Sequence, residues 1–210
     1  MVRALVKKGA QMLSSSDTRG ALPGGAVPRE GESGDDVTMT RALAEEAAAQ
    51  VLQRAWAAGD GSIQLPVDPV EVAARLGIAT VVMHLPDDVS GAIIKQPDGP
   101  ARIYLRPSDT DNRKRFTCAH ELGHYMKKLI ENDVEELDSL SYIDVRTPRA
   151  AEGTDEAEIF ANSFAAALLM PPKEFCEIFE ASSNRFETAR VFQVSADAVT
   201  NRSHVLKLSK

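Results

Sequence analysis

The sequence predicts an α+β fold that is mostly helical, with a small mixed or antiparallel sheet and a helix-turn-helix-like segment at the C-terminus. Three observations lead to this prediction. Apolar residues recur at helical spacing in several stretches after residue 40. Short runs rich in Val, Ile and Leu occur between residues 78 and 105. Gly and Pro separate these stretches, which suits short connections between elements.

Composition limits the class of protein. The chain has 210 residues, 43% hydrophobic and 26% charged, which suits one globular domain with appendages. A net charge of -7 argues against a dominant nucleic-acid surface. Cys118 and Cys176 are too few for a disulfide framework, and the longest apolar run, 164–170, is too short to span a bilayer. We therefore expect a cytoplasmic protein with no membrane partner.

Three regions are expected along the chain. Residues 1–37 are rich in Ser, Gly and Pro and should form a disordered tail. Residues 38–180 should form the main domain. Residues 181–210 should form the helix-turn-helix-like segment and pack on that domain.

The first two helices are predicted from residues that cap or end helices. Thr40 is expected to cap a helix that Gly59 ends, and Asp68, followed by Pro69, should cap a second helix that Gly77 ends. A strand is then expected over residues 78–84.

A hairpin should follow. Its strands are 92–95 and 102–105, joined around Pro-Asp-Gly-Pro, and we expect 102–105 at a sheet edge. Beyond it, 112–128 should form a helix and 131–154 a long acidic loop. An apolar helix is expected over 155–170, ended by two prolines, with helix again from Lys173.

The main chemical signal is the motif His-Glu-Leu-Gly-His at residues 120–124. Positions four apart lie on one face of a helix, so His120 and His124 can bind one zinc ion. Glu121 then lies beside the metal and can act as the catalytic base toward a water molecule. Gly123 lowers helix propensity, which indicates close approach of a neighbouring backbone.

Catalytic zinc needs a third protein ligand and an open position. His84, His204 and several carboxylates are available. The best candidate is Glu158, because it lies in an apolar helix where an unpaired carboxylate would be costly. Asn162, four residues later, can orient one of the metal ligands without binding the metal itself. Glu156 is the rival ligand, although favourable charge at a helix start also explains it.

Taken together, Arg-Phe-Thr-Cys-Ala-His-Glu-Leu-Gly-His and the downstream Glu-x-x-Ala-Asn-x-Phe-Ala-Ala-x-Leu-Leu-Met-Pro resemble the ImmA/IrrE metallopeptidases from about residue 40 to 209. The resemblance implies a zincin-like fold over 38–180, Zn²⁺ as cofactor, and removal of helix-turn-helix repressors in mobile elements or stress responses. By motif, His120, His124 and Glu158 match the zinc ligands and Glu121 the catalytic glutamate. The chain has Arg106 where the family often has Asn.

The C-terminal segment leaves alternatives open. Val194 and Ser195 predict a turn and a cap between two helices, and Arg202, His204 and Lys207 could face phosphates. Direct DNA binding by one such unit would be weak, so packing or repressor contact is the favoured role. The leading function is a zinc endopeptidase that cleaves a helix-turn-helix repressor. The alternatives are a non-catalytic repressor-binding antirepressor and a DNA-associated regulator, each with a structural zinc site.

Overall fold

The computed structural model describes residues 34–97, 99–132, 142–146 and 156–209. Residues 1–33, predicted to be disordered, and 133–141 and 147–154, predicted to be loop, lie outside the described part, as does Asp155, the predicted first residue of a helix. No helix of the described residues is long and apolar enough to cross a membrane.

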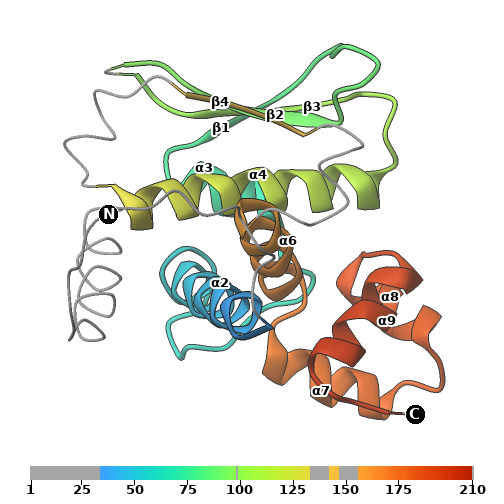
Figure 1. The fold of residues 1–210 in the computed structure, drawn as a ribbon. Coiled ribbons are helices and arrows are strands. Elements are labelled where there is room, and N and C mark those ends of the chain that lie inside the picture. Colours follow the sequence, from blue (N-terminus) through green and yellow to red (C-terminus); the bar gives the residue numbers. More distant parts are fainter. Residues whose placement is uncertain (1–33, 98, 133–141, 147–155, 210) are drawn as a thin grey trace, which may run out of the picture.

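The described residues form stacked layers (Figure 1). The sheet covers helix α4, Asp111–Glu131, and helix α6, Glu156–Leu169, crosses beneath α4. Helix α2, Gly34–Ala55, packs against α6, while α3, Pro69–Arg75, packs against α4. The prediction of a mostly helical α+β fold is confirmed.

The sheet is mixed and has the order β1-β3-β2-β4 in the described residues. Strand β1 is Ala79–Val82, β2 is Gly91–Lys95, β3 is Arg102–Leu105 and β4 is Tyr142–Arg146. Strands β2 and β3 form the predicted hairpin, with Ile93 opposite Ile103. Strand β1 is parallel to β3, and β4 is antiparallel to β2.

Two predictions about the sheet are wrong. Strand β3 is not at an edge, because β1 pairs with its other side; the outer strands are β1 and β4. The expected long loop 131–154 contains β4, whose residues Tyr-Ile-Asp-Val-Arg alternate β-formers with charged residues. The approach of β1 to β3 and of β4 to β2 joins distant parts of the chain, which local sequence patterns do not reveal.

The start of the main domain also differs from the prediction. Helix α2 begins at Gly34, so Thr40 lies inside it, buried, and is not its cap. Residues 34–37, assigned to the tail, belong to this helix. Asp35 and Asp36 lie in its first turn, where carboxylates offset the positive end of the helix dipole. By contrast, Asp68 caps α3 as predicted, accepting a hydrogen bond from the Val70 N–H.

The C-terminal unit consists of three helices beside α6 (Figure 1). They are α7, Pro172–Ala181, α8, Arg185–Phe192, and α9, Ala196–Val205. Ser195 caps α9 by accepting from the Ala198 N–H, as the predicted turn required. The Asn112 side chain donates to the Val194 carbonyl at 3.1 Å, so this unit packs directly on the start of α4.

Candidate metal centre

Helix α4 places the motif in the interior. Thr110 caps the helix by accepting a hydrogen bond from the Arg113 N–H. Ten residues later His120 and Glu121 are fully buried, and His124 is 4% exposed. Spacing of four residues puts both histidines on the face of α4 that meets α6.

Gly123 explains how α4 and α6 approach so closely. A Cβ at Gly123 would lie 2.9 Å from the Ala161 Cα and 3.1 Å from its carbonyl oxygen, distances at which the backbone must shift. The glycine therefore has the packing role that the sequence predicted. Close packing brings α6 near enough for Glu158 to reach the histidines.

Three side chains meet between these helices. The Nε2 atoms of His120 and His124 lie 2.9 Å apart. Glu158 Oε1 lies 3.2 Å from His124 Nε2, and its Oε2 lies 3.4 Å from His120 Nε2. The candidate ligand atoms of the three residues all lie within 4.8 Å of one another, so they could hold a metal ion.

Asn162 fixes the hydrogen position on one imidazole. Its side-chain oxygen lies 3.0 Å from His120 Nδ1. A carbonyl oxygen only accepts, so Nδ1 carries the hydrogen and a neutral His120 presents the lone pair of Nε2 to the centre. Orientation of an imidazole by a hydrogen bond at its other nitrogen is typical of metal-binding histidines.

The rival carboxylate is engaged elsewhere. Lys127 Nζ lies 2.9 Å from Glu156 Oε1 and 2.8 Å from Glu131 Oε1. Burial alone lowers the pKa of Lys127, but the hydrogen bonds and charges of Glu131 and Glu156 outweigh it and leave that pKa above its usual range. Lys127 thus ties the first turn of α6 to α4, with Glu156 turned to the lysine and Glu158 to the histidines.

The Glu121 carboxylate lies close to the start of β2. A Cβ added at Gly91, the first residue of β2, would lie 2.3 Å from Thr117 Cγ2 and 3.3 Å from Glu121 Oε1. The contact with the Thr117 methyl group is too short for any side chain at position 91, and the contact with the carboxylate is tight. The sequence analysis did not single out Gly91, because its role depends on packing between β2 and α4.

A second positioning contact was also missed. The Arg106 guanidinium donates to the carbonyls of Pro86, at 2.5 Å, and Val89, at 2.6 Å. These two hydrogen bonds fix the position of the segment that precedes β2. The residue that departs from the family's frequent Asn therefore holds the loop beside Gly91 in place.

Four further side chains are not among the candidate ligands. His84 is exposed, and Tyr125 is partly buried against the core. Burial raises the pKa of the Cys118 thiol to about 12, despite its contact with Thr80 at 4.0 Å. Arg115 donates to the carbonyls of Val67 and Gln193 and so joins α4 to its neighbours.

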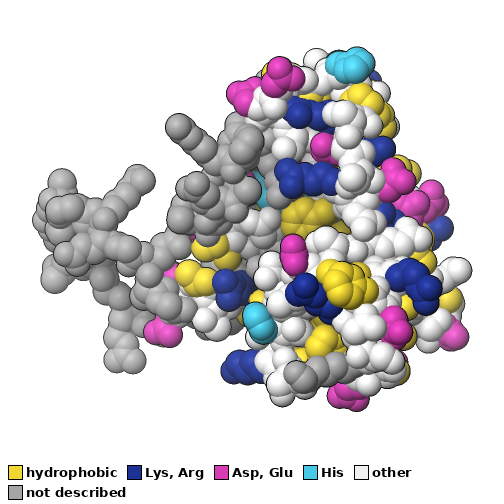
Figure 2. Space-filling model, turned by 90° about the vertical axis from the view of Figure 1, so that its right-hand side faces the viewer, with side chains coloured by type: hydrophobic (Ala, Val, Ile, Leu, Met, Phe, Trp, Pro, Cys, Tyr) yellow, Lys and Arg dark blue, Asp and Glu magenta, His cyan; other side chains and the backbone are white. Residues whose placement is uncertain are grey.

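One expectation for the C-terminal unit is wrong. Arg202 does not face solvent: it is 2% exposed, pairs with Glu45, and donates to the Met170 carbonyl at 3.1 Å. Its long side chain crosses the interface between α9 and α2. His204 and Lys207 are exposed. Figure 2 shows basic side chains scattered among acidic and hydrophobic ones on the side that carries α8 and α9.

Comparisons with known proteins identify a similar fold and a family. A solved structure, a Mycobacterium tuberculosis transcriptional regulator, matches with a TM-score of 0.51 and 18% identity, over 80% of this chain and 51% of that one. The likeness shows a shared fold, and this chain spans about half the length of that protein. None of the proteins with curated descriptions matches. The family model of the M78 peptidases, described as the IrrE N-terminal-like domain, matches residues 73–204, and the chain belongs to this family.

Proposed function

We propose that the chain is a zinc-dependent endopeptidase with one metal ion held by His120, His124 and Glu158. The observation that supports it most is the convergence of these side chains beside the buried Glu121, in a member of a peptidase family. Two imidazoles and one carboxylate are a ligand set of catalytic zinc enzymes, which keep one position open. The set fits the cluster, because His120 Nε2 presents its lone pair to the centre and one Glu158 oxygen lies 3.4 Å from His120 Nε2 and the other 3.2 Å from His124 Nε2.

The proposed chemistry divides between the metal and the protein. A zinc ion at this position would supply Lewis acidity and lower the pKa of a water molecule. Glu121, which follows His120 directly, would accept a proton at its carboxylate as general base and return it to the leaving amine. The lack of a side chain at Gly91 lets β2 pack closely over Thr117 and Glu121. Asn162 keeps His120 in the required tautomer.

The proposed substrate is a helix-turn-helix repressor, cut in an exposed segment. A peptidase cleft takes extended chain, which a folded helix cannot offer, so the cut should fall in a loop or linker. An extended substrate can pair with an outer strand. Of the outer strands, β4 is the better candidate, because it pairs with β2 at Gly91 beside Glu121.

The alternative is removal of a repressor by contact alone, with a structural zinc site. A structural site has closed coordination and needs no base. Glu121, which follows His120 in the sequence and is fully buried, supplies a base that a structural site would not need, and this favours catalysis. Direct DNA binding is less favoured, because Arg202 is buried in an ion pair and the chain has a net charge of -7.

Substitution of Glu121 by Gln tests the proposal. The amide cannot accept the proton, so zinc content should stay the same while repressor cleavage falls on the order of a hundredfold or more. A helix-turn-helix repressor encoded beside the gene of this chain is the first substrate to test, with fragments mapped by mass spectrometry. Glu71→Gln, an exposed substitution on α3, is the matched control.

Full activity in the Glu121→Gln variant would contradict the mechanism. An intact repressor that nevertheless leaves its operator would instead favour removal by contact.

A further inference from the structure

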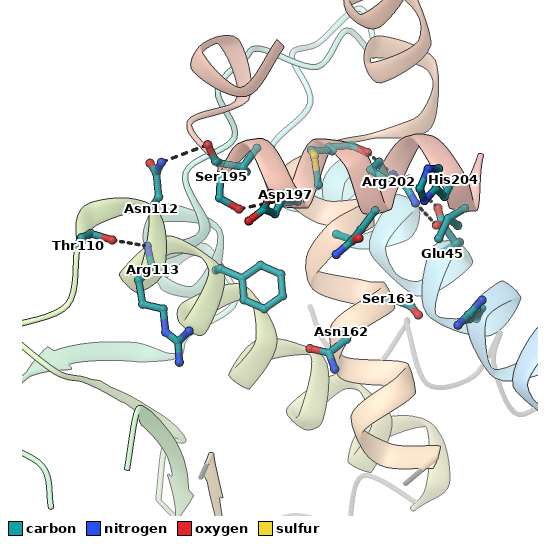
Figure 3. Close-up of a pocket in the computed structure, with 18 residues that line it drawn as sticks. Glu45, Thr110, Asn112, Arg113, Asn162, Ser163, Ser195, Asp197, Arg202 and His204 are labelled. Atoms are coloured by element: carbon teal, nitrogen blue, oxygen red, sulfur yellow. Dashed lines mark hydrogen bonds and ion pairs between the residues drawn. The ribbon is translucent and has the colours of Figure 1, made fainter. Parts of the chain in front are cut away.

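A cavity of about 870 Å³ opens between α2, α4, α6 and the C-terminal unit. Its volume lies in the range of ordinary ligand clefts. Figure 3 shows that side chains from all four parts surround the same space. The residues that line it include Arg41, Glu45, Arg113, Asn162, Asp197 and Arg202.

This cavity adjoins the metal cluster on two helices. On α4, Phe116 lines the cavity one turn before His120, and their rings are 6.2 Å apart between centroids. On α6, Asn162 lines it one turn after Glu158. Residues four apart share one helix face, so the face that presents the candidate ligands also forms the cavity floor. This cavity, called the groove below, therefore borders the metal cluster, whose own side chains are buried and do not line it.

The far wall of the groove is the start of α9. Ser195, Asp197, Ala198 and Asn201 line it. In DNA-binding helix-turn-helix units, the first residues of the second helix contact the bases. Here the corresponding residues face α4 and α6 across the cavity (Figure 3). The C-terminal unit thus contributes a surface to the peptidase groove.

The groove has a local charge opposite to that of the chain. Glu45 and Arg202 neutralise each other in an ion pair. Arg41 and Arg113 are exposed, and Arg113 donates to the neutral hydroxyl of Ser90 at 3.2 Å. Asp197 lies in the first turn of α9, where the helix dipole offsets its charge. An acidic group would therefore be favoured in the groove.

We propose that this groove holds the segment of the polypeptide substrate that flanks the scissile bond, and that Arg41 and Arg113 select a carboxylate side chain in it. The inference rests on the proposed peptidase function. Arg113 precedes His120 by seven helical residues, about 10 Å along the axis. An extended peptide covers that distance in about three residues. The acidic residue should therefore lie about three positions from the cut bond.

A binding measurement tests this directly. The probes are two fluorescein-labelled ten-residue peptides of Gly, Ser and Leu, identical except for two Glu or two Lys residues. Fluorescence anisotropy is followed with the full-length, zinc-loaded Glu121→Gln protein, which should not consume them. The acidic peptide should bind about tenfold more tightly than the basic one. Asp197→Asn should strengthen its binding further.

Charge reversal supplies the decisive variants. The double variant Arg41→Glu, Arg113→Glu should invert the preference, with folding checked by circular dichroism. Arg41→Ala and Arg113→Ala should each weaken binding of the acidic peptide about threefold. Arg54→Glu is the matched control, because Arg54 is exposed on α2 but does not line the cavity. It should leave the preference unchanged.

Equal binding of the two peptides, binding of neither, or a preference that survives in the double variant would overturn the inference. Because binding is measured without Glu121, these outcomes do not depend on catalysis. A different outcome would separate the two proposals. If the acidic peptide binds more tightly and the double variant inverts this preference, but the wild type cleaves no repressor, the inference about the groove is supported and only the proposed peptidase function is contradicted.

Discussion

Helix α6 connects two clusters of buried polar side chains, one near its start and one just past its end. Near the start, Glu158 meets His120 and His124. Past the end, the Met170 carbonyl accepts from Arg202, which pairs with both oxygens of Glu45. The second cluster contains a donor for each acceptor and is complete. The first brings together several acceptors, and a cation would satisfy them all.

This difference separates a structural cluster from a chemical one. Burial and charge are common to both, so neither property identifies a functional site. The distinguishing feature is the balance of donors and acceptors. At the metal cluster, Asn162 keeps the hydrogen of His120 on Nδ1, away from the centre. The Nε2 atom of a neutral His120 is then a hydrogen-bond acceptor, which adds one more acceptor to the cluster.

The largest expected effect on stability is at the complete cluster. Glu45→Ala leaves Arg202 buried without its carboxylate and should reduce the free energy of unfolding by about 3 kcal/mol, the low end for buried pairs because Glu45 is partly exposed. Glu46→Ala, at the exposed neighbour, should change it by less than about 0.5 kcal/mol. Urea denaturation measures both.

The double variant Glu45→Leu, Arg202→Leu should recover most of that loss, since an apolar pair can replace a buried ion pair. Equal urea midpoints for Glu45→Ala and Glu46→Ala would show that this ion pair does not stabilise the packing of α9 on α2.

A smaller effect is expected behind the metal cluster. Asn162→Ala removes the acceptor of His120 Nδ1 and should weaken zinc binding about 10- to 100-fold, the usual range for such a supporting residue. Ser163→Ala, the next residue on α6, is the matched control. Competition with a chromophoric chelator gives both dissociation constants for zinc. Equal values for the two variants would show that Asn162 does not support zinc binding.

The two clusters also differ in how far the sequence predicts them. His120, Glu121 and His124 lie within five residues of a strongly periodic helix, and Glu158 was found because its helix is otherwise apolar. The structure brings His120, His124 and Glu158 together, as expected. The Arg202–Glu45 pair joins residues 157 positions apart, and nothing local distinguishes Arg202 from an exposed arginine.

The same limit applies to the fold. Helices α4 and α6 and the β2–β3 hairpin follow from local periodicity and turn residues. The sheet order does not, since β1 and β4 reach their partners across the chain, and β3 was wrongly expected at an edge. Gly91 was missed for a related reason, because its contact with Glu121 exists only after β2 packs on α4.

The smallest expected effect concerns a buried group that belongs to neither cluster. The pKa of Cys118 is raised to about 12, chiefly by burial, so its thiol stays neutral across the physiological range and adds no pH dependence to stability there. Iodoacetamide at pH 8 should modify the partly exposed Cys176 well before Cys118. Peptide mapping checks the order, and early modification of Cys118 would show that this side of α4 opens.

The most direct test of the central claim is the metal content of purified variants after equilibration with zinc and removal of the excess. The wild type should retain one zinc ion per chain. The double variant His120→Ala, His124→Ala and the single variant Glu158→Ala should lose it, while Glu156→Ala, whose carboxylate pairs with Lys127, should retain it. Full zinc occupancy in the double-histidine variant, or loss in Glu156→Ala but not in Glu158→Ala, would contradict the account.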